Sequence, residues 1–180
     1  MKSKNIPVRD PNQSAVTLVV ADDTPSALCD VLDGPTATAT TAALTDAIAA
    51  HDPAVVVVDA PAVADPQAVV TAIRDAAPPA AVVVGVGTPA GDIECPPPRE
   101  AAPESIREAV AQARTTAAYH QSVTALYEQC RTHTFGAPDD AIEDARSDAD
   151  ARLASLPTDA WTVAAALRSS PPADDGDAPD

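Results

Sequence analysis

The amino-acid sequence predicts an α/β fold in which a doubly wound parallel sheet of four to five strands precedes an α-helical hairpin. Short valine-rich runs are bounded by turn-forming residues, as is typical of strands buried on both faces of a parallel sheet. Segments with helical spacing of apolar residues separate these runs, which indicates alternating strands and helices. After Pro103 the strands cease, and two long segments that each carry an apolar stripe follow.

The first half of the chain predicts strands and helices in alternation. The strands are expected at residues 16–21, 36–41, 54–58 and 81–84, the second of them as a weak edge strand. The first helix has a start signal at Thr24-Pro25, and the second has an apolar face formed by Leu44, Ala47 and Ile48. The third has both, with a start signal at Asp65-Pro66 and an apolar face formed by Val69, Val70 and Ile73. The first helix is short and ends near Gly34.

The segment after the fourth strand leaves little room for a fifth. Residues 87–98 are rich in glycine and proline where another helix and strand are expected. Ile93, Glu94 and Cys95 form the only candidate for the fifth strand, and Pro96 ends it. With this strand the expected order is 2-1-3-4-5, and without it the sheet has four strands.

Two helices that pair as an antiparallel hairpin, in the manner of a coiled coil, are predicted after Pro103. The apolar stripe of the first consists of Ile106, Val110, Ala113, Tyr119, Val123, Leu126 and Cys130, and Cys130 is expected in the core. The second follows a Gly-Ala-Pro breaker and carries Ile142, Ala145, Ala149, Leu153 and Leu156 on one face, opposite many aspartates. A last short helix is expected to begin at Pro157 and to anchor itself through Trp161.

These elements divide the chain into four parts. Residues 1–14 form a polar tail without fixed structure, and residues 15–113 form the α/β domain. Residues 114–168 form the helical module, and residues 169–180 form a disordered tail rich in proline and aspartate.

The chain is strongly acidic, with 27 Asp and Glu against 11 Lys and Arg and a formal net charge of -16. Binding to nucleic acid through a basic face is therefore excluded, because neutralising phosphates requires clustered Lys and Arg. Lys2 and Lys4 are the only lysines. This acidic, lysine-poor composition resembles that of proteins from halophilic archaea, in which high salt screens the self-repulsion of the charge.

Cysteine usage and hydropathy indicate a protein of the cytoplasm. Cys29, Cys95 and Cys130 are far apart and lack CxxC spacing, so neither a disulfide framework nor a zinc site is expected. The positively charged N-terminal residues are followed by no apolar run, so we expect no signal peptide. No uninterrupted apolar stretch is long enough to span a bilayer, so no contact with a membrane is expected.

Three carboxylates follow neighbouring strands of the predicted sheet. Asp22 and Asp23 come directly after the first strand, and Asp59 comes after the third. In an open parallel sheet, ligands bind beyond the carboxyl ends of the strands near the switch point of the winding, so these acids are expected to converge there. Clustered carboxylates need a cation, and Mg²⁺ held by carboxylates and water is the natural one. A carboxylate beside that ion can attack a phosphoryl group and form an aspartyl phosphate.

The segments VTLVVADDTP, DPAVVVVDAP and AVVVGVG resemble the receiver domains of two-component response regulators, over roughly residues 15–113. The resemblance implies a flavodoxin-like sheet, a Mg²⁺ site formed by Asp22, Asp23 and Asp59, and Asp59 as the phosphoacceptor. It also implies a sensor histidine kinase as partner in a phosphorelay. The segments TAAYHQSVTALYEQC and DARSDADARLASL resemble the HalX helical module, which follows receiver domains in response regulators of halophilic archaea.

The chain departs from the receiver pattern at two places. The family keeps a Thr or Ser at the end of strand four, and here Gly85, Val86 and Gly87 carry no hydroxyl. The family also keeps a Lys after strand five, and here that position falls on Pro96 or Arg99. An aspartyl phosphate at Asp59 would therefore lack its cationic partner and the hydroxyl that reports it.

The preferred hypothesis is an atypical, degenerate response regulator that acts through protein–protein contacts. The first alternative is a genuine phosphoacceptor that takes its phosphoryl group from a sensor kinase. The second is a non-signalling interaction protein that forms homodimers through its C-terminal helices, and in this case the aspartates serve only as strand-end and helix-capping residues. We predict no enzymatic activity, because the three histidines lie away from the strand ends and no Ser/His/Asp or Cys/His arrangement is present.

Overall fold

The structure is a computed structural model that describes residues 16–22, 28–78, 81–87, 102–132 and 139–158. Four parallel strands form one sheet in the order β2-β1-β3-β4. Their bounds are Thr17–Val20 for β1, Thr36–Ala39 for β2, Val55–Asp59 for β3 and Val82–Val86 for β4. The predicted α/β architecture and the order 2-1-3-4 are confirmed, with β2 at the edge as expected. The candidate fifth strand at residues 93–95 lies outside the described residues.

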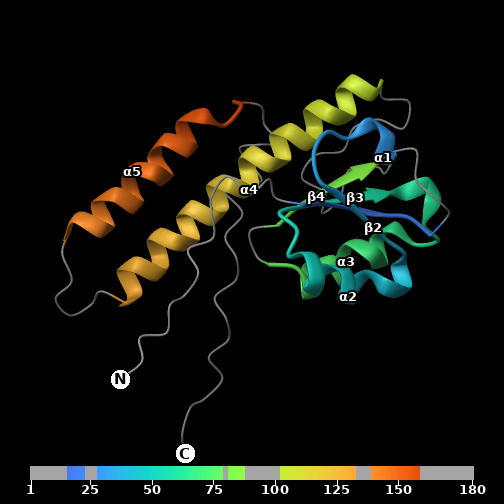
Figure 1. The fold of residues 1–180 in the computed structure, drawn as a ribbon, viewed down its shortest axis with the longest axis horizontal. Helices are drawn as coiled ribbons and strands as arrows, with labels where there is room; N and C mark the ends of the chain where they lie inside the picture. The colour runs from blue at the N-terminus through green and yellow to red at the C-terminus, as the bar shows by residue number, and fades with distance from the viewer. Residues whose placement is uncertain (1–15, 23–27, 79–80, 88–101, 133–138, 159–180) are drawn as a thin grey trace, which may run out of the picture.

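Helices cover both faces of this sheet, as Figure 1 shows. The short α1 (Leu28–Val31) and the first part of α4 (Pro103–Thr132) lie on one face. The other face is covered by α2 (Leu44–His51) and α3 (Pro66–Ala76). Two 3₁₀ turns, Thr41–Ala43 and Ala60–Ala62, lead from β2 into α2 and away from the end of β3.

The strands β1, β3 and β4 are buried on both faces because they consist almost entirely of valine and other apolar residues. Val19, Val57 and Val84 belong to the core below α1 and α4. Their chain neighbours Val20 and Val58 belong to the core below α2 and α3. This alternation is what the pleat of a strand imposes, and it explains why the sequence reads as continuous apolar runs.

The start of α3 follows the sequence signal. Asp65 adopts an extended conformation, its carboxylate accepts a hydrogen bond from the Ala68 amide at 3.0 Å, and Pro66 occupies the first helical position. Val69, Val70 and Ile73 are buried, as their spacing predicted. The proposed start of α1 at Thr24 and Pro25 lies outside the described residues.

Two arginines tie the first half of α4 to the chain around β1. The Arg114 guanidinium donates hydrogen bonds to Thr17 Oγ1 at 2.9 Å and to the Asp33 carbonyl at 2.6 Å. It also lies against Gly34, where an added Cβ would be 3.6 Å from its Nη2 atom and where φ is +87°, a conformation that favours glycine. Arg107 Nε donates to the carbonyl of Val31 at 2.9 Å.

The second half of α4 extends past the sheet, with α5 (Asp139–Ser155) beside it and running in the opposite direction (Figure 1). Ile106, Val110, Ala113 and Ala117 are buried against the sheet, and α4 continues without a break across residues 113 and 114. Pro157 and Thr158, where a last helix was expected to begin, have no helical structure, and the rest of that segment, with Trp161, lies outside the described residues.

The prediction that Cys130 lies in the core is wrong, and the apolar stripe of α4 is not covered at Val123 either. Val123 is 40% exposed, and Cys130 is exposed as well. Ser122 of α4 and Ala149 of α5 are buried instead. The physical reason is that this part of α4 has left the sheet, so α5 is the element of the described chain that remains to cover it.

Replacing Ile73 by Ala is expected to lower the free energy of unfolding by about 2–5 kcal/mol, because the side chain is fully buried between α3 and the sheet. Thr71→Ala on the exposed side of α3 is the matched control and is expected to change it by less than about 0.5 kcal/mol. Urea unfolding at the salt concentration of maximal stability measures both. Equal effects would show that α3 does not cover the sheet.

Candidate functional site

The two described acids of the predicted site lie at the same edge of the sheet. Asp59 is the last residue of β3, and Asp22 follows the end of β1 by two residues. The strands β1 and β3 are parallel neighbours, with Val20 paired to Val58. Carboxyl ends of adjacent parallel strands meet at one edge, which is why their position could be predicted from the sequence. Asp23 lies outside the described residues.

Asp22 holds the beginning of the segment that leads into α2. Its carboxylate accepts hydrogen bonds from the Thr41 amide at 2.8 Å and from the Thr41 hydroxyl at 2.9 Å. Its own amide donates to the Ala62 carbonyl at 2.8 Å. The N–H groups at a helical start have no partner within the helix, so this carboxylate supplies the acceptor that Thr41 needs. Asp22 thus has a structural role at this helical turn, and its predicted role as a Mg²⁺ ligand stays a prediction.

Asp59 belongs to the other side of the sheet. It is half-buried, precedes the 3₁₀ turn Ala60–Ala62, and is paired with Val86 of β4. Because side chains alternate along a strand, Asp59 shares the side of Val57 and Val86, which the helices α1 and α4 cover. The Asp22 carboxylate instead bonds to Thr41, on the way into α2 on the opposite face.

The end of β4 beside Asp59 carries no hydroxyl. Val86 is 6% exposed and packs in the core with Val84, and Gly85 pairs with Val58. Gly87 follows with a φ of +77°, in the left-handed region that glycine adopts without strain. The residue directly opposite Asp59 is thus a buried valine. Pro96 and Arg99, the other two departures from the receiver pattern, lie outside the described residues.

The described residues place no three side chains of His, Cys, Asp or Glu together as a group that could hold a metal ion. The predicted Mg²⁺ site includes Asp23, so it stays a prediction. Of the two cysteines described, Cys29 is half-buried. Burial and, to a smaller extent, the neighbouring Asp30 raise the pKa of the Cys29 thiol, which keeps it protonated and unreactive at neutral pH.

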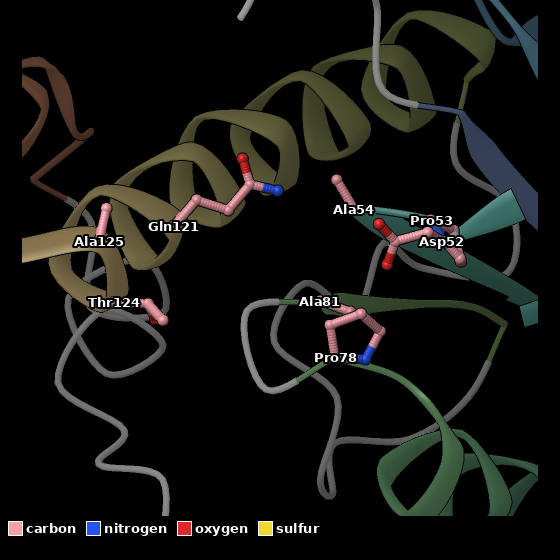
Figure 2. A pocket seen from close by; sticks show the side chains of 8 residues that line it. All are labelled: Asp52, Pro53, Ala54, Pro78, Ala81, Gln121, Thr124 and Ala125. Atoms are coloured by element: carbon pink, nitrogen blue, oxygen red, sulfur yellow. The ribbon is translucent and has the colours of Figure 1, made fainter. Parts of the chain in front are cut away.

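A second feature lies at the opposite edge of the sheet and was missed by the sequence reasoning. A hollow of about 350 Å³ opens below the overhanging part of α4, beside the residues that precede β3 and β4 (Figure 2). Its lining residues are Asp52, Pro53, Ala54, Pro78, Ala81, Gln121, Thr124 and Ala125. Three separate segments contribute to it, and in the sequence the Asp52-Pro53 dipeptide is the one signal of a special turn among them.

Comparisons with protein-family models, with curated proteins and with solved structures found no match to this chain. Among the described residues, no helix combines the length and the apolar character that crossing a bilayer requires. The two edges of the sheet and the surface of α4 and α5 are therefore the features from which a function can be inferred.

Replacing Asp22 by Ala is expected to lower the free energy of unfolding by about 0.5–2 kcal/mol, the usual effect of removing a helix-capping acceptor. Thr41→Val removes the hydroxyl that bonds to the same carboxylate. In a double-mutant cycle the two substitutions should be less than additive, because each removes the same contact. Full additivity would show that the Asp22 carboxylate does not bond to Thr41 in solution.

Proposed function

We propose that this chain is an atypical signalling protein of the response-regulator kind that acts in the cytoplasm through protein–protein contacts. Asp59 occupies the phosphoacceptor position in this proposal. The observation that carries it is the location of Asp59 at the carboxyl end of β3, next to the central β1, in a parallel sheet of order 2-1-3-4. This is the edge at which open α/β sheets bind their ligands.

The chemistry at Asp59 explains why the proposed protein is atypical. In a working receiver of this kind, Asp22, Asp23 and Asp59 would hold a Mg²⁺ ion that neutralises the charge of the phosphoryl oxygens. Asp59 would form the new O–P bond while the N–P bond of a kinase phosphohistidine breaks and the imidazole takes up a proton. The buried Val86 opposite Asp59 cannot donate a hydrogen bond to the phosphoryl group. A phosphorylated Asp59 would thus have no hydroxyl at this position through which to move the end of β4.

The proposed output surface lies on α4 and α5, which we interpret as a HalX-like helical hairpin. Among the described residues three large apolar side chains are exposed, and all belong to these two helices: Val123 at 40%, Tyr127 at 67% and Leu153 at 49%. Val123 and Tyr127 lie one turn apart on α4, and neighbouring exposed aromatic and aliphatic side chains are typical of surfaces that bind another protein. From residue 115 to 132, α4 carries one Glu and one Arg, which form an ion pair at 2.9 Å. A second copy of this acidic chain can approach that nearly neutral stretch without strong repulsion.

The phosphoacceptor part of the proposal is tested with beryllofluoride and Mg²⁺ at molar salt. If the site binds them, the amide signals of Asp59, Val86 and Gly87 should shift, while those of residues 67–76 in α3 remain unchanged. The shift should be smaller than a full switch of β4, because Val86 lacks the hydroxyl. Asp59→Asn should abolish the shifts and any phosphoryl labelling by a sensor kinase.

Three outcomes decide against parts of this interpretation. Labelling that survives Asp59→Asn would assign the phosphoacceptor to another residue. A complete displacement of β4 on beryllofluoride binding would favour the genuine phosphoacceptor over the atypical protein. If no amide signal shifts, the proposed function consists of protein–protein contact alone, and the acids at the carboxyl edge are the remains of a phosphorylation site.

Tyr127→Glu is expected to weaken self-association through α4 and α5 by at least about tenfold, since it places a charge on the exposed apolar surface. Stability should change by less than about 0.5 kcal/mol, because the tyrosine is largely exposed. Ala151→Glu adds the same charge at an exposed position of the other helix, α5, and is the matched control. Sedimentation equilibrium measures the monomer–dimer constant of each variant. Equal weakening by both substitutions, or a wild-type chain that stays monomeric at about 100 µM, would contradict the proposed contact surface.

A further inference from the structure

The hollow at the amino edge of the sheet is formed by an overhang. The strands β3 and β4 begin there, and the second half of α4 projects beyond them (Figure 1). Ala54 and Ala81, which are buried, precede the two strands and form the floor together with Pro53 and Pro78. Gln121, Thr124 and Ala125 come from the exposed part of α4 and form the opposite wall. The hollow is therefore open to solvent and remote from Asp59.

Hydrogen bonds to backbone carbonyl groups fix the floor of the hollow and its rim. Asp52 has a left-handed conformation with φ of 45°, and its amide donates to the Ile48 carbonyl at 2.8 Å, which ends α2 and turns the chain into β3. Arg74 Nη1 donates to the Ala81 carbonyl at 3.1 Å, which ties α3 to the start of β4. The hollow is thus preformed, and an occupant does not have to order its floor.

The chemistry of the lining selects for a particular kind of occupant. Prolines and alanines offer an apolar floor without large side chains, so small apolar groups fit against it. In Figure 2 the Asp52 carboxylate and the Gln121 amide point toward one another across the hollow. A cationic side chain between them can bond to both. A volume of about 350 Å³ is at the lower end of the range of about 300–1,000 Å³ that ligand pockets have.

A segment of this chain with matching chemistry enters from the same edge. The first described residue, Val16, directly precedes Thr17, which is paired with Val55 at the start of β3. Val55 in turn follows Ala54 of the floor. The fifteen residues before Val16 lie outside the described residues and contain Ile6, Pro7, Val8 and Arg9 in sequence. Six residues lie between Arg9 and Val16, and an extended chain of that length spans about 20 Å.

Charge favours the same segment. Residues 1–14 hold three basic residues, Lys2, Lys4 and Arg9, against the single acid Asp10, in a chain with a net charge of -16. Both lysines of the chain are among them. A basic segment is attracted to an acidic domain, and a tether this short keeps its local concentration in the millimolar range.

We propose that this hollow is a peptide-binding groove and that its occupant is the chain's own N-terminal segment, residues 6–9. Ile6, Pro7 and Val8 lie against the proline and alanine floor, and the Arg9 guanidinium bonds to Asp52 and Gln121. Docking is weak and reversible, since the groove is small and open. This docking of the N-terminal segment goes beyond the proposed signalling function and does not depend on Asp59.

The proposal is tested on the full-length chain by comparing amide spectra of the wild type and a triple variant, Ile6→Ser, Val8→Ser and Arg9→Ser. Unchanged amide signals of β1 at residues 18–20 show that the variant keeps its fold. The amides of Asp52, Ala54, Ala81 and Gln121–Ala125 should shift, and those of Asp22 and Val86 at the other edge should not. Asn12→Ser with Gln13→Ser is the control in the same segment and should leave the groove amides in place.

A synthetic peptide of residues 4–12, added to the triple variant, should return the groove amides toward their wild-type positions. Ala125→Trp fills the groove from an exposed position and should weaken this binding by at least about tenfold without loss of fold. Groove amides that do not respond to the triple variant overturn the proposal. The proposal is also overturned if the groove amides of the wild type shift with protein concentration, because the occupant is then a second copy of the chain.

Discussion

The packing of the first half of α4 against the valines of β1, β3 and β4 is the interaction on which the rest of the structure depends. A parallel sheet has two apolar faces, and each must be covered by helices. On one face α2 and α3 provide this cover, whereas on the other the short α1 covers too little. Ile106, Val110 and Ala113 complete that face, and Arg107 and Arg114 fix the helix to the backbone around β1. Because valine and alanine each bury little area, losing this one helix would expose a whole face.

The length of α4 then determines where the chain can bind other molecules. Its 30 residues exceed what the sheet can cover, so the second half projects from the domain. On that projecting half lie the contact with α5, the exposed Tyr127 and the wall of the hollow at the amino edge. The acidic positions Asp22 and Asp59 are at the opposite edge of the same strands. The two regions are thus separated by the length of a strand, and a change at one need not disturb the other.

The candidate site at the carboxyl edge was predictable in position but not in the role of each residue. Acids that follow neighbouring parallel strands must lie at one edge, and both described aspartates do. The partner of Asp22 is Thr41, 19 residues further along the chain, and no local pattern connects them. The same limit explains the error at Cys130. Helical spacing identifies an apolar stripe, but only the position of α4 relative to the sheet decides how far along the helix that stripe is covered.

The sequence by itself determined the alternation of strands and helices, the helix start at Asp65 and Pro66, and the placement of Asp59 at a strand end. These features depend on local patterns of burial, on proline geometry and on the two-residue period of a strand, all of which are written in adjacent residues. The tertiary structure alone decided that Asp22 bonds to Thr41, that Val86 lies opposite Asp59, and that a hollow forms where α4 passes the ends of β3 and β4. Each of these joins segments that are distant in the chain, and their meeting depends on strand register and helix length together.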